Sequence, residues 1–312
     1  MTPPPPPPSF RLSRRGGGNA PDAALDDTDL AAARDALAQG RWGDSRTLLA
    51  HTREDWDRRG HRLVVLADSP GSLAWAREWQ QTEPESGDAA ALAACAAVSA
   101  AVRGRERPEN ARQAVADAAA RTPADPSPWL ASLLLARYTG TTDEARRAFH
   151  EVTVRHREHH HAHHLMAAVL AESPDPHTLY EFAHSSASHA PADSPLALLP
   201  VVAHAERFRA HRGGARTADR AAGEHWTGRH AAHLVRSAFD WWLEWGGEEG
   251  HPRRAVDLNF LAYAKFHEGR LAEAAALFQR VGSLVTPAPW SYTGRDAYKA
   301  FRAARATAYG SA

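Results

Sequence analysis

The sequence predicts an all-α protein, an α-solenoid of antiparallel helix hairpins, and three observations support this fold class. One spacing occurs three times: a glycine, a small residue five positions later, and a large apolar residue four beyond that. Most apolar segments have helical periodicity and end at glycine, proline or aspartate. Alternating β-branched segments are nearly absent, and residues 63–66 fit a helix turn as well as a strand. The repeated spacing occurs at Gly40, Ser45 and Leu49, at Gly140, Ala145 and Phe149, and at Gly269, Ala274 and Phe278.

Local signals mark where the helices begin and end. Asp26, Asp27 and Thr28 offer an N-cap, and Gly40 ends the helix that follows. Serine or aspartate followed by proline, as at Ser127, predicts an N-cap with proline in the first turn. The predicted helices are Leu30–Gln39, Trp42–Ala50, Ser69–Gln81, Asp88–Arg103, Pro108–Arg121, Ser127–Tyr138, Thr142–Arg155, His159–Glu172, Asp175–His189, Ser194–His211, Arg229–Trp245, Arg253–His267, Leu271–Ser283 and Tyr292–Ala308.

The 312 residues are too many for one compact core unless the helices form a stacked array. Residues 1–24 contain an unbroken proline run, arginines and three consecutive glycines, which predicts a disordered, Pro-rich leader. A helical array is predicted over 25–211. Residues 212–228 are polar with paired glycines and predict a linker or loop, and 229–312 predict a C-terminal helical module.

Composition excludes several classes of partner. Lys plus Arg and Asp plus Glu are 37 each, so no basic excess indicates nucleic acid. The longest apolar runs are shorter than the roughly 20 residues of a membrane span. The single cysteine, Cys95, permits no internal disulfide, fits a cytoplasmic location and predicts a buried, inert thiol. No nucleophile elbow, phosphate loop or dinucleotide fingerprint occurs, so no cofactor is expected and the prediction is not an enzyme.

The hairpin residues resemble the tetratricopeptide-repeat family. The match is best at Leu261, Ala262, Gly269, Ala274 and Phe278, and a second hairpin with Trp129, Gly140, Ala145 and Phe149 fits the same frame. Ser45, Leu49 and Asp29 depart from the pattern, which suggests a divergent cap. Segments between Trp129 and Arg209 also resemble uncharacterised bacterial tetratricopeptide-like proteins, which implies a helical scaffold with no assigned reaction.

Histidine is the outlier of the composition, because 16 of the 19 histidines lie between His150 and His251. On a helix His156, His160 and His164 share one face, and His159 pairs with His163. Two imidazoles one turn apart can chelate Zn²⁺ or Ni²⁺, with Glu158 as a further ligand. The other interpretation is a solvated polar face, with some of the histidines filling contacts between helices. A metal site would need a ligand from elsewhere, and His230 and His233 are candidates. Acidification is expected to loosen this segment.

The predicted function is a non-catalytic cytoplasmic scaffold or adaptor that binds a protein segment on its concave surface. First-helix residues line that surface in the family, so the expected contacts are Trp129, Leu133, Arg137, Tyr263 and Lys265. Trp241 and Trp245 either form an aromatic patch along a groove or pack in the core. The oligomeric state stays open. One alternative is a metal-binding protein that uses the histidine cluster; another is an enzyme whose site brings distant histidines and carboxylates to a pocket.

Overall fold

A computed structural model describes residues 21–211, 218–246 and 250–310, and within these ranges the chain is helical and contains no strand. The Pro-rich leader falls outside the described residues except for 21–24, where Ala24 is buried. The helices in the first half are α1 (Thr28–Leu37), α2 (Gly43–Thr52), α3 (Trp56–Ala67), α4 (Ser72–Thr82), α5 (Gly87–Val102), α6 (Pro108–Arg121), α7 (Ser127–Thr139) and α8 (Thr142–Thr153). Those in the second half are α9 (His160–Ala171), α10 (Pro176–His189), η1 (Pro195–Leu198), α11 (Leu199–His211), α12 (Ala218–Trp226), α13 (Arg229–Trp245), α14 (Arg254–His267), α15 (Leu271–Val281), α16 (Pro287–Trp290), η3 (Ser291–Thr293) and α17 (Ala297–Gly310).

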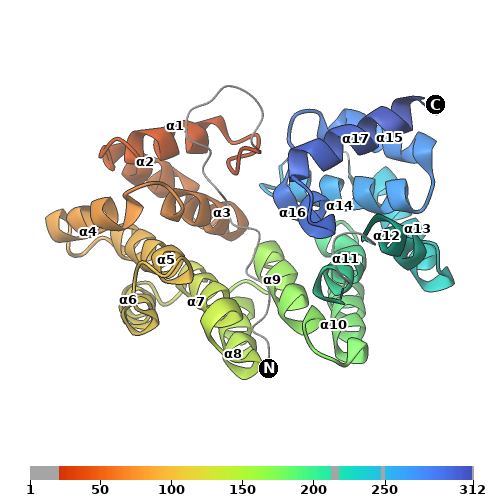
Figure 1. Cartoon of the computed structure of the whole chain (residues 1–312). Helices are drawn as coiled ribbons and strands as arrows, with labels where there is room; N and C mark the ends of the chain where they lie inside the picture. Colours follow the sequence, from red (N-terminus) through yellow and green to blue (C-terminus); the bar gives the residue numbers. More distant parts are fainter. Residues whose placement is uncertain (1–20, 212–217, 247–249, 311–312) are drawn as a thin grey trace.

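The helices follow one another as packed neighbours, and odd-numbered helices also contact the next odd-numbered helix from α1 to α11. Helices α1 to α6 lie on one side of the molecule and α10 to α17 on the other, with α9 between them (Figure 1). Two hydrophobic clusters fill the interior. One comprises residues from 24 to 135 and the other residues from 130 to 308, so both clusters include side chains of α7.

The small residues of the repeated spacing are buried as predicted. Ser45, Ala145 and Ala274 are each 0% exposed, which lets neighbouring helices approach closely. Gly40 and Gly269 have φ of 86° and 83°, the left-handed conformation that favours glycine after a helix. Gly140 ends α7 without a positive φ. There a Cβ would lie 2.5 Å from Glu144 Oε2 and 2.9 Å from Ala136 Cα, so glycine permits a close approach instead.

Helix α3 was not predicted, because five charged or polar side chains interrupt its apolar spacing. Arg59 and Arg62 are nevertheless buried, since ion pairs satisfy them. Arg59 contacts Asp125 at 2.8 Å and Asp88 at 2.7 Å, and Arg62 contacts Asp27 at 2.8 Å. The predicted linker also contains an unexpected helix, α12, while residues 212–217 lie outside the described residues.

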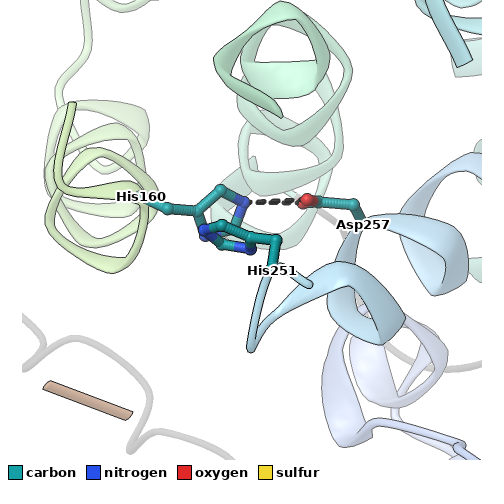
Figure 2. Close-up of side chains that lie close together, drawn as sticks. All are labelled: His160, His251 and Asp257. Carbon is teal, nitrogen blue, oxygen red and sulfur yellow. Dashed lines mark hydrogen bonds and ion pairs between the residues drawn. The ribbon is translucent and has the colours of Figure 1, made fainter. Parts of the chain in front are cut away.

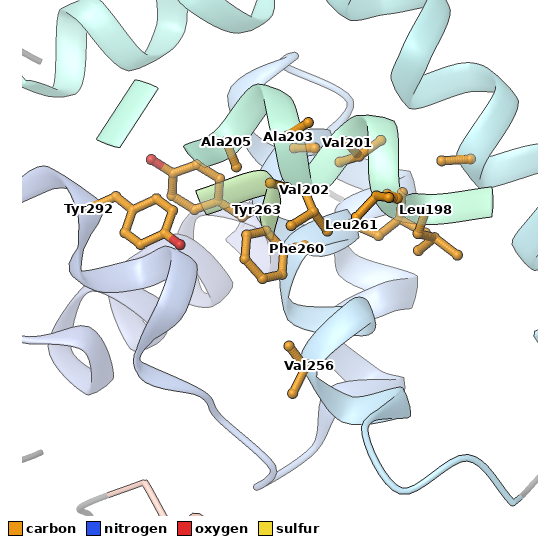
Figure 3. Packing of buried hydrophobic residues seen from close by; sticks show 14 of the residues in the cluster. Leu198, Val201, Val202, Ala203, Ala205, Val256, Phe260, Leu261, Tyr263 and Tyr292 are labelled. Carbon is orange, nitrogen blue, oxygen red and sulfur yellow. The ribbon is translucent and has the colours of Figure 1, made fainter. Parts of the chain in front are cut away.

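The core between α11 and α14 fixes the position of the first turn of α14. Val201, Val202 and Ala205 of α11 face Phe260 and Leu261 of α14, and all five are buried (Figure 3). Helix α11 also packs against α9. The first turns of α9 and α14 are therefore held near each other by apolar contacts elsewhere on the same helices. Of the helices that the structure describes, none is long and apolar enough to cross a membrane.

Candidate metal centre

Two histidines and an aspartate from separate segments meet between α9 and α14. His160 is the first residue of α9, Asp257 lies in the first turn of α14, and His251 belongs to the segment before α14. Each offers one ligand atom, and these three atoms all lie within 4.8 Å of one another. The three side chains point toward a common point (Figure 2). We call these three residues, together with Asp57 beside them, the α9 centre.

Hydrogen bonds define the tautomer of His160. Its Nε2 lies 2.8 and 3.0 Å from the two carboxylate oxygens of Asp257, so Nε2 carries the proton and donates it. The rings of His160 and His164 are stacked at a centroid distance of 4.1 Å, and His164 Nε2 is 3.4 Å from Asp257 Oδ1. The ring of His251 lies 4.6 Å from that of His160. Three imidazoles therefore surround one buried carboxylate.

Several buried ring nitrogens in this region have no hydrogen-bond partner among the described residues. They are His160 Nδ1, His164 Nε2, His251 Nε2 and both nitrogens of His159. A buried polar atom without a partner loses the free energy of its hydration, so proteins leave few such atoms. Their concentration at one place indicates that the α9 centre contacts something other than protein, either an ion or ordered water.

Asp57 of α3 holds the start of α9 in place. Its carboxylate accepts the backbone N–H of His160 at 2.8 Å and contacts His156 Nε2 at 2.8 Å. It is also 3.5 Å from His159 Nδ1 and 3.9 Å from His251 Nε2. Since no side chain of its own segment caps α9, an aspartate from a distant helix provides the missing acceptor. The first half of the chain thereby orients the histidines that face the second half.

Close packing of α3 against the histidines depends on Gly60. A Cβ at this position would lie 3.0 Å from both His159 Nε2 and Leu130 Cδ2, tighter than nearly all real contacts. Arg58, on the same helix, donates from Nη2 to the carbonyl of Gly250 at 2.6 Å. Helix α3 thus touches α9 on one face and the segment that carries His251 on another.

Burial and charge act in opposite directions at the α9 centre. Burial lowers the pKa of His160 to about 3, against the opposing charge of Asp257. Burial also lowers the pKa of His159 to about 4. Burial alone would raise the pKa of Asp257, but the contacts with His160 hold it below its usual range. His160 is therefore neutral and Asp257 ionised at neutral pH, which are the protonation states that bind metals.

Buried Arg253 adds a positive charge to this environment. Burial lowers its pKa to about 10, although Asp257 and Asp57 favour the charged form. Two carboxylates against one guanidinium leave one negative charge on these buried groups (two minus one). The contact with Asp57 raises the pKa of His156, despite its partial burial. A cation in the centre would therefore meet a carboxylate surplus that His156 partly offsets.

The ligand set fits a divalent transition metal. Two imidazoles and one carboxylate bind Zn²⁺ and also Fe²⁺. Tetrahedral zinc with bonds of about 2.1 Å places its ligand atoms about 3.4 Å apart, so the side chains would close by about 1 Å around the ion. Three protein ligands leave a coordination position for water or another molecule.

A pocket of about 390 Å³ adjoins the centre. His251 and Asp257 line it together with Asp57, and the opposite wall consists of Trp241, Trp242 and Trp245 from the last turns of α13. The tryptophans were predicted to form either a groove patch or core packing; they are half-buried and line this pocket. Distant histidines and carboxylates therefore lie beside this pocket, but the enzyme alternative called for a deep, enclosed pocket and stays a prediction.

The five histidines predicted as metal ligands have different surroundings. His159, His160, His163 and His164 are buried, which contradicts a solvated face but agrees with the other half of that interpretation, histidines that fill contacts between helices. His160 belongs to the three-residue group and His164 lies next to it, whereas His156 and His159 precede the helix and contact Asp57. His163 packs against Phe149, with ring centroids 5.0 Å apart, and its Nδ1 donates to the His159 carbonyl at 3.0 Å.

The helix itself explains these differences. It begins at His160 rather than His159, so His156 and His160 are not one helical turn apart as expected. His230, which was considered as a further ligand, lies instead against Tyr180 at 4.9 Å. Sequence reasoning did not find Asp57, His251 or Asp257. No motif in their own segments marks them, and only tertiary packing brings them to the cluster.

The residues predicted to contact a partner are mostly inside the protein. Leu133 and Tyr263 are 0% and 1% exposed, and Lys265 is buried with Nζ 2.6 Å from Glu273. Arg137 contacts Glu172 at 3.8 Å, and Trp129 packs under Arg155 at 5.3 Å. A partner could not reach Leu133, Tyr263 or Lys265 in this conformation, and their burial gives the predicted contacts no support. Trp241 and Trp245 keep accessible surface at the pocket.

A second group of histidines lies between α11 and α12. The rings of His204 and His225 are stacked at 3.7 Å, and each Nε2 donates to the carbonyl of the other residue, at 3.1 and 2.9 Å. His204 Nδ1 then accepts from the hydroxyl of Tyr180 at 2.7 Å. We call His204 and His225 the stacked pair. No carboxylate among the described residues contacts it.

No family model matches the chain, and no curated protein is significantly similar to it. The resemblance to tetratricopeptide repeats accordingly remains a prediction from the sequence.

Proposed function

We propose that this protein binds one divalent transition-metal ion, Zn²⁺ being the first to test, through His160, His251 and Asp257. The observation that carries the proposal is the meeting of three ligand atoms within 4.8 Å, from segments up to 97 residues apart. The buried Nε2 of His251, which has no hydrogen-bond partner among the described residues, supports it, because a metal ion can take the place of the missing partner.

The proposal also explains why Asp57 lies beside the three proposed ligands. Metal-bound histidines usually have a carboxylate or carbonyl partner that fixes the orientation of their rings. Asp57 contacts His156, lies near His251 and fixes the backbone of His160. Binding of the metal at His160 Nε2 would move the ring proton to Nδ1 and replace the hydrogen bond to Asp257, so the neutral ring keeps its one proton and releases none.

Metal content and calorimetry test the proposal. Untagged protein should contain about one equivalent of metal, and after chelation it should rebind about one equivalent of Zn²⁺ in calorimetric titrations. Asp257→Asn keeps the size of the side chain and removes its charge. We expect it to weaken Zn²⁺ binding at least about a hundredfold.

The matched control is His177→Ala. His177 is an exposed histidine on α10, 82% accessible, and lies outside the α9 centre. It should leave the zinc stoichiometry and affinity unchanged. Equal zinc affinity for wild type, Asp257→Asn and His177→Ala would overturn the proposal, because binding would then come from surface histidines.

A second candidate function is the adaptor predicted from the sequence, and the contacts between successive odd-numbered helices favour it. In a tetratricopeptide-like solenoid the first helices of successive hairpins stack in this way and form a concave surface. We propose this arrangement together with a protein partner. A protein captured from cells with this chain should be purified and mixed with the purified chain. Formation of a complex that contains one copy of each would support the adaptor role. Failure of every captured protein to rebind would remove it.

A further inference from the structure

The pocket beside the α9 centre has an aromatic wall that is fixed in place. Trp241 and Trp245 are one helical turn apart on α13, and Trp242 stacks on Phe239 at 5.8 Å. The indole N–H of Trp241 donates to the carbonyl of Ala192 at 2.6 Å. That bond holds the indole next to Asp193, which also lines the pocket.

The charged lining of the pocket is predominantly acidic. Its carboxylates are Asp55, Asp57, Asp193 and Asp257, and its guanidinium is Arg254, which donates to Gly246 O at 2.9 Å. His251 is the imidazole of the lining.

Other groups compensate most of these charges. Arg58 pairs with Asp55 at 3.0 Å, and Arg253 acts on Asp57 and Asp257 from behind the wall. Four carboxylates against the three guanidinium groups of Arg58, Arg253 and Arg254 leave one negative charge. Asp57 and Asp257 also have histidine partners. Asp193, by contrast, is exposed and has no ion pair among the described residues, so the surplus lies beside the tryptophans.

We propose that this pocket binds a small organic cation of the alkylammonium class, held between the indoles of Trp241 and Trp245 and the carboxylate of Asp193. Indole faces attract cations, and quaternary ammonium groups are recognised by aromatic cages of this kind. The volume of about 390 Å³ is within the usual range for small-molecule sites. A carboxylate ligand, by contrast, would face the acidic lining.

This inference goes beyond the metal proposal and does not depend on it. The two are nevertheless linked, since His251 and Asp257 belong both to the pocket wall and to the metal ligands. A bound divalent ion would cancel negative charge at the inner end of the pocket. Zinc and the organic cation should therefore weaken each other's binding by the same factor.

The test uses metal-free, full-length protein and three probes of similar size. Choline carries the positive charge, 3,3-dimethyl-1-butanol is its uncharged isostere, and benzoate is an anion. Binding is followed by tryptophan fluorescence and calorimetry. Choline should bind about tenfold more tightly than the isostere, and benzoate should not bind measurably.

Two variants locate the site. Asp193→Asn should weaken choline binding about fivefold to tenfold and leave the isostere unaffected, whereas Trp245→Leu should weaken both. Asp240→Asn is the matched control, because Asp240 is exposed on α13 outside the pocket lining. Circular dichroism verifies folding of each variant.

Equal affinity for choline and its uncharged isostere would overturn the proposal, as would equal losses for Asp193→Asn and Asp240→Asn. If the protein binds choline but no zinc, only the metal proposal is overturned. If it binds zinc but not choline, only the organic-cation proposal is overturned.

Discussion

The α9 centre and the stacked pair contain the same kind of side chain in different surroundings. In and beside the α9 centre, imidazoles meet carboxylates from distant helices, and the rings of His159, His160, His164 and His251 keep nitrogens without a hydrogen-bond partner among the described residues. In the stacked pair, His204 and His225 satisfy each other through backbone carbonyls, and Tyr180 occupies the remaining nitrogen of His204. Histidine content alone therefore does not indicate a metal site. A buried carboxylate beside the rings, and ring nitrogens without a hydrogen-bond partner, distinguish a candidate metal centre from buried histidines whose hydrogen bonds are all made within the protein.

The largest expected difference between the two regions is the effect of zinc on stability. A ligand at 100 times its dissociation constant stabilises the folded state by about 2.7 kcal/mol. Wild type and His204→Phe should both gain this stability, while His251→Ala should gain almost none. Thermal and urea unfolding with and without Zn²⁺ measure it. A zinc-dependent gain that survives in His251→Ala would move the metal site away from the α9 centre.

The next effect is the response of the stacked pair to acid. Burial lowers the pKa of His204 to about 3, far below the 6.5 of an unfolded histidine. Above pH 6.5 both states are neutral and stability is complete. Between pH 6.5 and about 3 only the unfolded chain takes up the proton, so stability falls as the pH falls, by up to about 1.4 kcal/mol per pH unit.

Replacing His204 should remove its contribution to the pH dependence of the free energy of unfolding. Urea unfolding of wild type and His204→Phe at pH 7.5, 6.5 and 5.5 measures the difference, which does not depend on the stability of the variant at neutral pH. A slope identical in both proteins would show that His204 is accessible to protons in the folded state. Buried His159, His160 and His163, whose pKa values are also lowered by burial, should act in the same direction.

A smaller effect is expected at the contact between α3 and His159. Gly60→Ala would force its Cβ against His159 and Leu130, at a cost of about 1–2 kcal/mol after the better helix propensity of alanine is included. It should also weaken zinc binding by shifting the histidine segment. Gly43→Ala, where a Cβ meets nothing within 4 Å, is the control. Equal stabilities for both variants would show that the α3 contact is loose.

The smallest expected effect is that of Tyr180→Phe. It removes the hydroxyl that donates to His204 Nδ1 and leaves this nitrogen without a partner, which costs about 1 kcal/mol. Zinc affinity should not change, because Tyr180 lies outside the α9 centre. A change in zinc affinity would mean that the two histidine regions are coupled.

The helices were accessible to sequence reasoning where their signals are local. Asp175 caps α10, with Pro176 as its first residue, and Thr141 and Glu144 form a capping box at the start of α8. These contacts involve neighbours in the sequence, so the pattern alone reveals them. Helix α3 was not predicted from the sequence because Arg59 and Arg62 break its apolar periodicity. Their burial depends on ion pairs with aspartates far along the chain.

The candidate site could be predicted only in part, for the same reason. The density of histidines near His160 is visible in the sequence, but Asp57 and Asp257 are single acidic residues among 37. Nothing near them indicates a shared site. Their meeting depends on α3 touching α9 and on the packing of α11 between α9 and α14. Burial of cationic and polar residues such as Lys265 is likewise set by tertiary contacts.

The most direct measurement is an anomalous difference map at the zinc absorption edge, from crystals of untagged protein. A single peak bounded by His160, His251 and Asp257 is the expected result. A peak held by other histidines, or a zinc-treated crystal with no peak between α9 and α14, would contradict the metal centre.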